Sequence, residues 1–232
     1  MNILIPMAGE GSRFRDAGFK MPKPLVPVNG VPMIQRVIEN LGGPSEHFIF
    51  VVQLRHIYEY GIDAKLREMC PGCKVVAIDG LTGGAAVTAL RASAHIDNYA
   101  PLLIANSDQL IEGWSLPDTK VDGVIYTFWS DQTKWSYAAV GEYDRVYGVA
   151  EKQVISRAAT CGIYYWRRGS DFVKYARQMV DAGRRCNGEF YIAPVYNEAI
   201  LDCKDIVAMN VERMHGLGTP EDLRAYEDLS CP

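Results

Sequence analysis

Short apolar runs alternate with amphipathic segments through the first half of the chain, and this alternation restricts the fold more than any other feature. The runs are continuous and rich in Val, Ile, Leu and Phe, as expected for strands buried on both faces. Repeated strand–helix units of this kind predict a parallel sheet with helices on both sides. The predicted strands are 2–7, 47–53, 74–78 and 101–106, and the predicted helices are 32–41, 57–69 and 84–94.

The second half is richer in strands and in Tyr, Val and Trp, which favours antiparallel additions to the same sheet. The complete prediction is an α/β chain with a Rossmann-like, mixed, mostly parallel sheet, helices on both faces and a β-rich lid. Predicted strands lie at 122–129, 136–144, 145–152, 160–168 and 205–211, and predicted helices at 170–183, 189–200 and 220–229.

Composition excludes several classes of partner. The 232 residues carry a formal net charge of -4 and are 48% hydrophobic, which suits one large globular core. A nucleic-acid or membrane partner would call for a basic excess that is absent, and no apolar run approaches the roughly 20 residues that span a bilayer. The first residues read as a strand rather than a signal peptide, so a cytoplasmic location and free cysteines are expected.

The loop after the first strand concentrates glycine and positive charge. Gly9 and Gly11 allow close backbone approach, while Arg13 and Lys23 bring cations to the same place. Backbone N–H groups and cations together favour phosphate. The pattern is not a dinucleotide fingerprint, which would need glycine at Phe14, and it lacks the Gly-Lys-Ser/Thr of an ATPase P-loop. Segments 79–84 and 106–109 also fall near the carboxyl ends of predicted strands, where ligands of such sheets bind.

Two motifs in this region carry a family resemblance. "GEGSRF" begins at Gly9, and "PKP" begins at Pro22 and is followed by "LVPVNGVPMI". Together with "LLIANSDQ" at 102–109, they resemble the sugar-phosphate nucleotidylyltransferases, or nucleoside-diphosphate-sugar pyrophosphorylases. The resemblance implies a GT-A-like nucleotidyltransferase fold in a single domain, 1–232. Residues 1–110 would form the nucleotide-binding half, and 111–232 the acceptor-binding half and lid.

The resemblance also implies roles for individual residues. Arg13, Lys23 and Asp108 would be catalytic, with Asp108 the ligand of a Mg²⁺ cofactor. Gln53 is assigned a base contact, although a solvated strand end is an equal alternative. The complete nucleotide site would consist of Ala8, Gly9, Gly11, Ser12, Arg13, Gln53, Gly83, Gly84 and Ser107.

An acceptor site is implied by segments of the second half. Glu151, Lys152 and Glu189 are the residues for which function outweighs a structural role. For the other predicted acceptor residues, a structural role is a serious alternative to a role in binding. The complete set is Tyr137, Ala138, Glu151, Lys152, Thr160, Gly162 and Glu189.

One position departs from the family pattern. Many pyrophosphorylases read Asp-x-Gly-Thr near the C-terminus and place a second carboxylate on the metal, whereas this chain has Gly216 there. Either Asp108 holds magnesium together with phosphate oxygens and water, or the metal is arranged differently. His215 is adjacent but is a poor magnesium ligand.

The implied reaction transfers a nucleoside monophosphate from a nucleoside triphosphate to a phosphorylated small molecule, with release of pyrophosphate. A sugar 1-phosphate is the expected acceptor, as in nucleotide-sugar and polysaccharide biosynthesis. A cytidylyltransferase acting on phosphocholine, a nucleotide-sugar-dependent glycosyltransferase and a non-catalytic nucleotide sensor remain open alternatives. A homo-oligomer is also left open.

Overall fold

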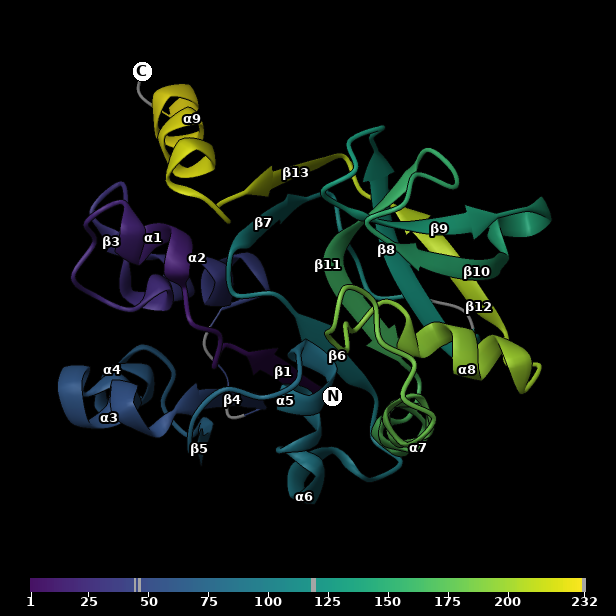
Figure 1. Cartoon of the computed structure of the whole chain (residues 1–232), viewed down its shortest axis with the longest axis horizontal. Coiled ribbons are helices and arrows are strands. Elements are labelled where there is room, and N and C mark those ends of the chain that lie inside the picture. The colour runs from purple at the N-terminus through teal and green to yellow at the C-terminus, as the bar shows by residue number, and fades with distance from the viewer. Residues whose placement is uncertain (44, 46, 118–119, 231–232) are drawn as a thin grey trace.

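The computed structural model describes residues 1–43, 45, 47–117 and 120–230 (Figure 1). Its main sheet contains β1 (Asn2–Pro6), β4 (Phe48–Gln53), β5 (Lys74–Ile78), β6 (Leu102–Ala105), β8 (Gly123–Trp129), β9 (Ser136–Val140), β10 (Val146–Glu151), β11 (Ala158–Trp166) and β12 (Ile206–Asn210). Within the described residues these nine strands run in the order β10-β9-β11-β6-β1-β4-β5, with β8 beside β11 and β12 beside β8. Strands from both halves of the chain therefore share one sheet.

Helices cover both faces of this sheet, as predicted. The described helices are α1 (Ser12–Asp16), α2 (Met33–Asn40), α3 (Leu54–Tyr60), α4 (Ile62–Met69), α5 (Ala85–Leu90), α6 (Ser93–Ile96), α7 (Gly169–Asp181), α8 (Val195–Leu201) and α9 (Pro220–Ser230). Side chains alternate across β1, so Ile3 and Ile5 join one hydrophobic cluster with α2 and α4, while Leu4 joins another with α5 and α7. No described helix is both long and apolar enough to cross a membrane.

The strands that the first half contributes to the main sheet, β1, β4, β5 and β6, are all parallel. β1 lies between β4 and β6, and β5 extends the sheet beyond β4. The carboxyl ends of β1, β4 and β6 therefore meet at one edge, which brings the loop after β1 close to the segment after β6. The second half adds antiparallel strands: β11 to β6, β8 and β9 to β11, and β10 to β9. Both predictions are confirmed, and β12 pairs parallel with β8.

Three predicted helices differ from the expectation in their bounds. The helix predicted at 57–69 lies in two helices, α3 and α4, which are separated at Gly61 because its left-handed backbone (φ 60°) ends α3. The helix predicted at 84–94 divides into α5 and α6. The helix predicted at 189–200 begins only at Val195, since the preceding residues cross over to pair with the segment before α5.

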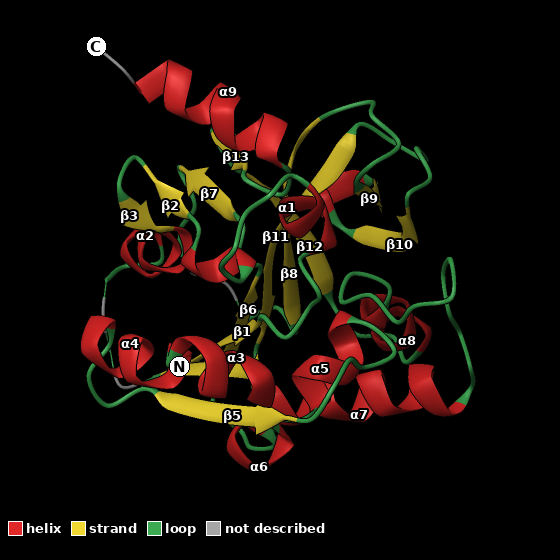
Figure 2. Cartoon of the chain, turned by 60° about the vertical axis from the view of Figure 1, so that its left-hand side comes forward, coloured by secondary structure: helices red, strands yellow, loops and turns green. Residues whose placement is uncertain are grey.

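Two small antiparallel sheets were not anticipated. One pairs β2 (Pro27–Val28) with β3 (Val31–Pro32), and the other pairs β7 (Gln109–Glu112) with β13 (Arg213–Gly216). The second brings the C-terminal part of the chain back to the carboxyl end of β6, and α9 follows directly (Figure 2). The C-terminal helix thereby borders the same edge as the loop after β1.

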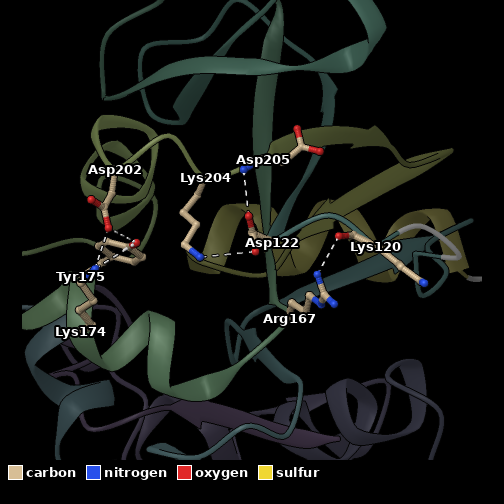
Figure 3. Close-up of polar contacts among 8 residues, drawn as sticks. All are labelled: Lys120, Asp122, Arg167, Lys174, Tyr175, Asp202, Lys204 and Asp205. Atoms are coloured by element: carbon tan, nitrogen blue, oxygen red, sulfur yellow. Dashed lines mark hydrogen bonds and ion pairs between the residues drawn. The ribbon is translucent and has the colours of Figure 1, made fainter.

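Polar contacts fasten the opposite edge of the sheet (Figure 3). The Asp205 N–H donates to Asp122 Oδ2 at 3.1 Å, and Lys204 Nζ lies 3.6 Å from Asp122 Oδ1. Arg167 donates to the Lys120 carbonyl at 3.1 Å. These contacts join the start of β8 to the start of β12 and the end of β11, leaving the other edge for ligands.

Candidate active site

The loop after β1 turns sharply at Gly11 and returns to the sheet at Lys23. Gly11 has φ 64° and precedes α1, and a Cβ added there would lie 3.3 Å from Lys23 Cβ. Both the positive φ and the close approach of the returning chain favour glycine at this position. The loop thus folds back on itself and presents its basic residues at the carboxyl end of β1.

The buried side chain of Gln53 supports the backbone of this loop. This side chain is 2% exposed, and its amide nitrogen donates to the carbonyls of Ala8 at 2.7 Å and Gly9 at 3.1 Å. The sequence assigned Gln53 a base contact with a solvated strand end as the alternative. The structure instead places it as a buried support of the loop backbone.

Lys23 and Asp108 meet where the loop returns to the sheet. Lys23 Nζ donates to Asp108 Oδ2 and lies 3.4 Å from the Gly218 carbonyl. Both side chains are mostly buried, at 19% and 23% exposed. The N–H of Leu217 donates to the Asp108 carbonyl at 2.8 Å, so the chain near β13 also fixes this position. Two predicted catalytic residues from separate motifs are therefore in direct contact.

A cavity of about 460 Å³ opens beside this pair and is called here the loop cavity. Arg13 is exposed at its margin. Of the predicted nucleotide-binding residues, Gly9, Gly11, Ser12, Arg13 and Ser107 line the cavity, together with Lys23 and Asp108. The remaining lining residues are Pro6, Met7, Phe14, Pro24, Ala85, Asn106, Glu189, Tyr191 and Gly218.

A second cavity of about 390 Å³, called here the strand cavity, adjoins the first. Five of the predicted acceptor residues line it: Glu151, Lys152, Thr160, Gly162 and Glu189. The two cavities have five lining residues in common, Arg13, Ala85, Asn106, Glu189 and Tyr191. Residues predicted for two different substrates therefore border two connected spaces, with Arg13 between them.

Charged side chains in the strand cavity have specific partners. Glu151 accepts a hydrogen bond from Ser136 Oγ, and burial raises the pKa of the Glu151 carboxyl above its usual value of 4.5. Lys152 Nζ donates to Tyr191 Oη at 2.8 Å, and this hydrogen bond raises the pKa of the lysine. Lys152 also has φ 54°, a backbone conformation that non-glycine residues adopt mainly at sites under constraint.

Gly162 lets two side chains of the "NSDQ" segment reach β11. A Cβ at Gly162 would lie 1.6 Å from Gln109 Oε1 and 2.6 Å from Asn106 Nδ2, and φ is +83°. The pairing of β11 with β8 is irregular here, between Thr160 and Tyr164. Asn106 and Gln109 both line the strand cavity, although neither was assigned a role from the sequence. Their position directly after an apolar strand was the available signal.

Besides Gln53, five predicted residues lie outside the lining of both cavities. Ala8 is buried, and its carbonyl accepts from Gln53. The other four lie further along the chain. Gly84 has φ +131°, and its missing side chain leaves room for the Phe190 backbone, 2.6 Å from a Cβ placed there. Gly83 accepts from the Phe190 N–H at 2.8 Å. Tyr137 and Ala138 are fully buried, with Tyr137 Oη donating to the Gln132 carbonyl at 2.7 Å. In this structure all four pack the strands and segments around the cavities.

A larger cavity of about 600 Å³ lies over β8, β9 and β12. None of the predicted site residues lines it. Trp129 and Arg157 border it, with the guanidinium 5.3 Å from the centre of the indole ring. The loop and strand cavities, by contrast, contain the predicted charges, and they form the candidate active site.

The buried Glu151 carboxyl generates a prediction about stability. Because its pKa is raised in the folded protein, ionisation opposes folding, and this cost grows as the pH rises from about 4.5 through the raised pKa. Glu151→Gln keeps an oxygen that accepts from Ser136 and removes the charge. We expect the melting temperature of the variant to exceed that of the wild type at pH 7.5, with the difference shrinking toward pH 4.

Glu142→Gln, which removes an exposed carboxylate between β9 and β10, controls for the change in net charge. A wild type more stable than Glu151→Gln at pH 7.5 would mean that Ser136 and Lys152 outweigh burial at this carboxylate. Thermal melts at half-unit pH intervals measure the difference.

Comparisons with known proteins agree with the sequence motifs. Residues 3–112 match the MobA-like NTP transferase domain family. The structure superposes on the nucleoside-diphosphate-sugar pyrophosphorylase from Vibrio cholerae RC9 with a TM-score of 0.85 and 24% identity, covering 97% of this chain and 99% of that one. It superposes on the CTP:phosphocholine cytidylyltransferase from Streptococcus pneumoniae with a TM-score of 0.77 and 17% identity, covering 99% of each chain.

A short stretch matches a curated protein more closely. It is 60% identical over 37 residues to the human mannose-1-phosphate guanylyltransferase regulatory subunit alpha. This stretch is 16% of the present chain and 9% of that relative. The solved structures show that the fold is the predicted GT-A-like one.

Proposed function

We propose that this chain, in which residues 3–112 form a MobA-like NTP transferase domain, transfers a nucleoside monophosphate from a nucleoside triphosphate to a phosphorylated small molecule. One observation carries the proposal. The loop cavity and the strand cavity adjoin, and cations from both halves of the chain line them: Arg13 borders both, Lys23 the first and Lys152 the second. Two anionic substrates held in adjoining sites are what this reaction requires.

The reaction needs positioning and charge neutralisation more than proton transfer. An oxygen of the acceptor phosphate would attack the α-phosphorus and form a new P–O bond. The bond between the α-phosphorus and the bridging oxygen would break, and pyrophosphate would leave with its electron pair. The attacking phosphate is already an anion, so a general base is not required. Arg13 and the loop N–H groups would hold the triphosphate, and Lys23 would face the α-phosphorus.

We propose Asp108 as a ligand of magnesium. Its carboxylate lines the loop cavity beside Gly218, with Lys23 Nζ as its partner. The described residues contain no preformed group of three or more His, Cys, Asp or Glu side chains for a metal, so phosphate oxygens and water would complete the coordination. When bound, the ion would neutralise charge on the phosphate oxygens.

A sugar 1-phosphate is the acceptor we favour. The strand cavity offers carboxylates at Glu151 and Glu189 and hydroxyls at Thr160 and Tyr191, which suit the hydroxyl groups of a sugar. Lys152 would meet the acceptor phosphate. The product would then be a nucleoside-diphosphate sugar, an activated precursor for glycan synthesis.

Phosphocholine is the second candidate, favoured by a different feature of the same cavity. Trp135, Tyr164 and Tyr191 line it beside the two glutamates. Aromatic faces and carboxylates together favour a quaternary ammonium group. A cytidylyltransferase acting on phosphocholine is therefore the second function to test, beside a nucleotidylyltransferase acting on a sugar 1-phosphate.

Lys23→Ala tests the assignment of the reacting phosphates. Because the ammonium is needed most when charge builds at the α-phosphorus, kcat should fall by at least about 10²-fold, the scale for losing one preorganised electrostatic group. Affinity for the triphosphate should fall far less. Lys74→Ala is the control, since Lys74 is exposed at the start of β5, on the opposite edge of the sheet. A kcat within a few-fold of wild type would remove Lys23 from the chemistry.

The acceptor is tested by pyrophosphate release from each of the four nucleoside triphosphates with glucose 1-phosphate or phosphocholine. Lys152→Ala should raise KM for the productive acceptor while nucleotide binding stays nearly unchanged, because Lys152 borders only the strand cavity of the two. Lys174→Ala on α7 serves as the surface control.

Three results would contradict these assignments. Equal losses of acceptor and nucleotide affinity in Lys152→Ala would end the division into two subsites. Nucleotide binding with no pyrophosphate release would favour a regulatory role, and sugar transfer from a nucleotide sugar would favour the glycosyltransferase.

A further inference from the structure

A second carboxylate lies close to Gly218, two residues after the position where the family pattern has an aspartate. A Cβ added at Gly218 would lie 3.3 Å from Asp108 Oδ2, 3.9 Å from Asp222 Oδ2 and 4.0 Å from Lys23 Nζ. Asp222 lies in the first turn of α9. Two carboxylates, one from the middle of the chain and one from its C-terminal helix, therefore flank the small space above one glycine.

Backbone contacts fix the path from Asp108 to this turn. The Leu217 N–H donates to the Asp108 carbonyl at 2.8 Å, and Gly216 pairs with Gln109 in the β7–β13 sheet. The Asp222 N–H then donates to Thr219 Oγ1 at 3.1 Å, which caps the start of α9. These hydrogen bonds order the backbone that leads from Asp108 to Asp222.

The two oxygens of Asp222 face different groups. Lys134 Nζ lies 3.4 Å from Oδ1 and borders the strand cavity, while Oδ2 is the oxygen near Gly218. The side chain is 27% exposed, close to the 23% of Asp108. Asp222 is thus partly withdrawn from solvent, and one of its oxygens is directed toward the space beside Asp108.

We propose that Asp222 supplies the second carboxylate for the divalent cation held at Asp108, in place of the aspartate expected at position 216. The inference rests on the proposed nucleotidyl transfer, which requires such an ion. Two carboxylate oxygens would be completed by phosphate oxygens and water, as magnesium tolerates. Lys23 would release Asp108 as the ion binds and turn toward the incoming phosphates.

The adjacent Glu221 provides a matched control. It occupies the same helical turn and has the same charge, so it shares any general interaction with the amino end of α9. Its side chain is 77% exposed and pairs with Arg224 at 3.4 Å. A role that depends only on helix stability would affect Glu221→Gln and Asp222→Asn alike.

Direct metal binding is the test, with Mn²⁺ as the probe and the electron paramagnetic resonance signal of free Mn²⁺ as the readout. The full chain is titrated to millimolar Mn²⁺ without nucleotide. Asp222→Asn and Asp108→Asn should each weaken binding by at least about tenfold, a scale seen even for groups that only support metal ligands. Glu221→Gln should bind as the wild type does, and Asp222→Glu should recover part of the affinity.

A rescue variant keeps the result independent of folding defects. Gly216→Asp in the Asp222→Asn background restores a carboxylate at the position expected from the family pattern, and it should recover Mn²⁺ affinity. Melting temperatures of all variants are measured alongside. An Asp222→Asn protein that binds Mn²⁺ like the wild type, or a wild type that binds none at millimolar concentration, would overturn the proposal.

The pyrophosphate assay separates this proposal from the proposed function. If the wild type releases pyrophosphate but Asp222→Asn keeps full Mn²⁺ affinity, only the assignment of Asp222 fails. If Mn²⁺ binding depends on Asp222 but no triphosphate yields pyrophosphate, the metal site stands and the nucleotidyl transfer fails.

Discussion

An ammonium group and a carboxylate meet where the loop after β1 returns to the sheet. Lys23 and Asp108 are both mostly buried, so each charge depends on the other for much of its stabilisation. Under the proposed function, a phosphate in the loop cavity would offer Lys23 a second anion, and a divalent cation would offer Asp108 a second positive charge. Binding of substrate and metal would then replace one buried ion pair by two, without leaving a charge alone.

The rest of the fold positions Lys23 and Asp108 beside each other. Parallel pairing aligns the ends of β1, β4 and β6, and Gln53 ties the end of β4 to the loop backbone. The segment before α8 crosses over to Gly83 and closes one side of both cavities through Glu189 and Tyr191. From the second half, the irregular stretch of β11 at Gly162 makes room for the polar side chains that follow β6.

The sequence was sufficient for features encoded locally. Continuous apolar runs predicted the parallel strands, and the two basic motifs together with "LLIANSDQ" predicted that Arg13, Lys23 and Asp108 would gather. Long-range features escaped because no local pattern encodes them. A polar residue at a strand end, such as Gln53, gives the same sequence pattern whether its side chain faces solvent or supports a buried loop. The four-residue strand β13 has too few side chains to show a period. Its pairing with β7 brings the start of α9, which contains Asp222, near Asp108.

We propose that cations in adjoining cavities promote one direct displacement at the α-phosphorus. The stereochemical course at that atom distinguishes one displacement from two. A nucleoside triphosphate made chiral at the α-phosphorus by sulfur substitution is converted to product, and the configuration is determined by ³¹P nuclear magnetic resonance. Direct in-line attack by the acceptor phosphate predicts inversion. Retention would mean two displacements through a nucleotidylated side chain, which would contradict this account.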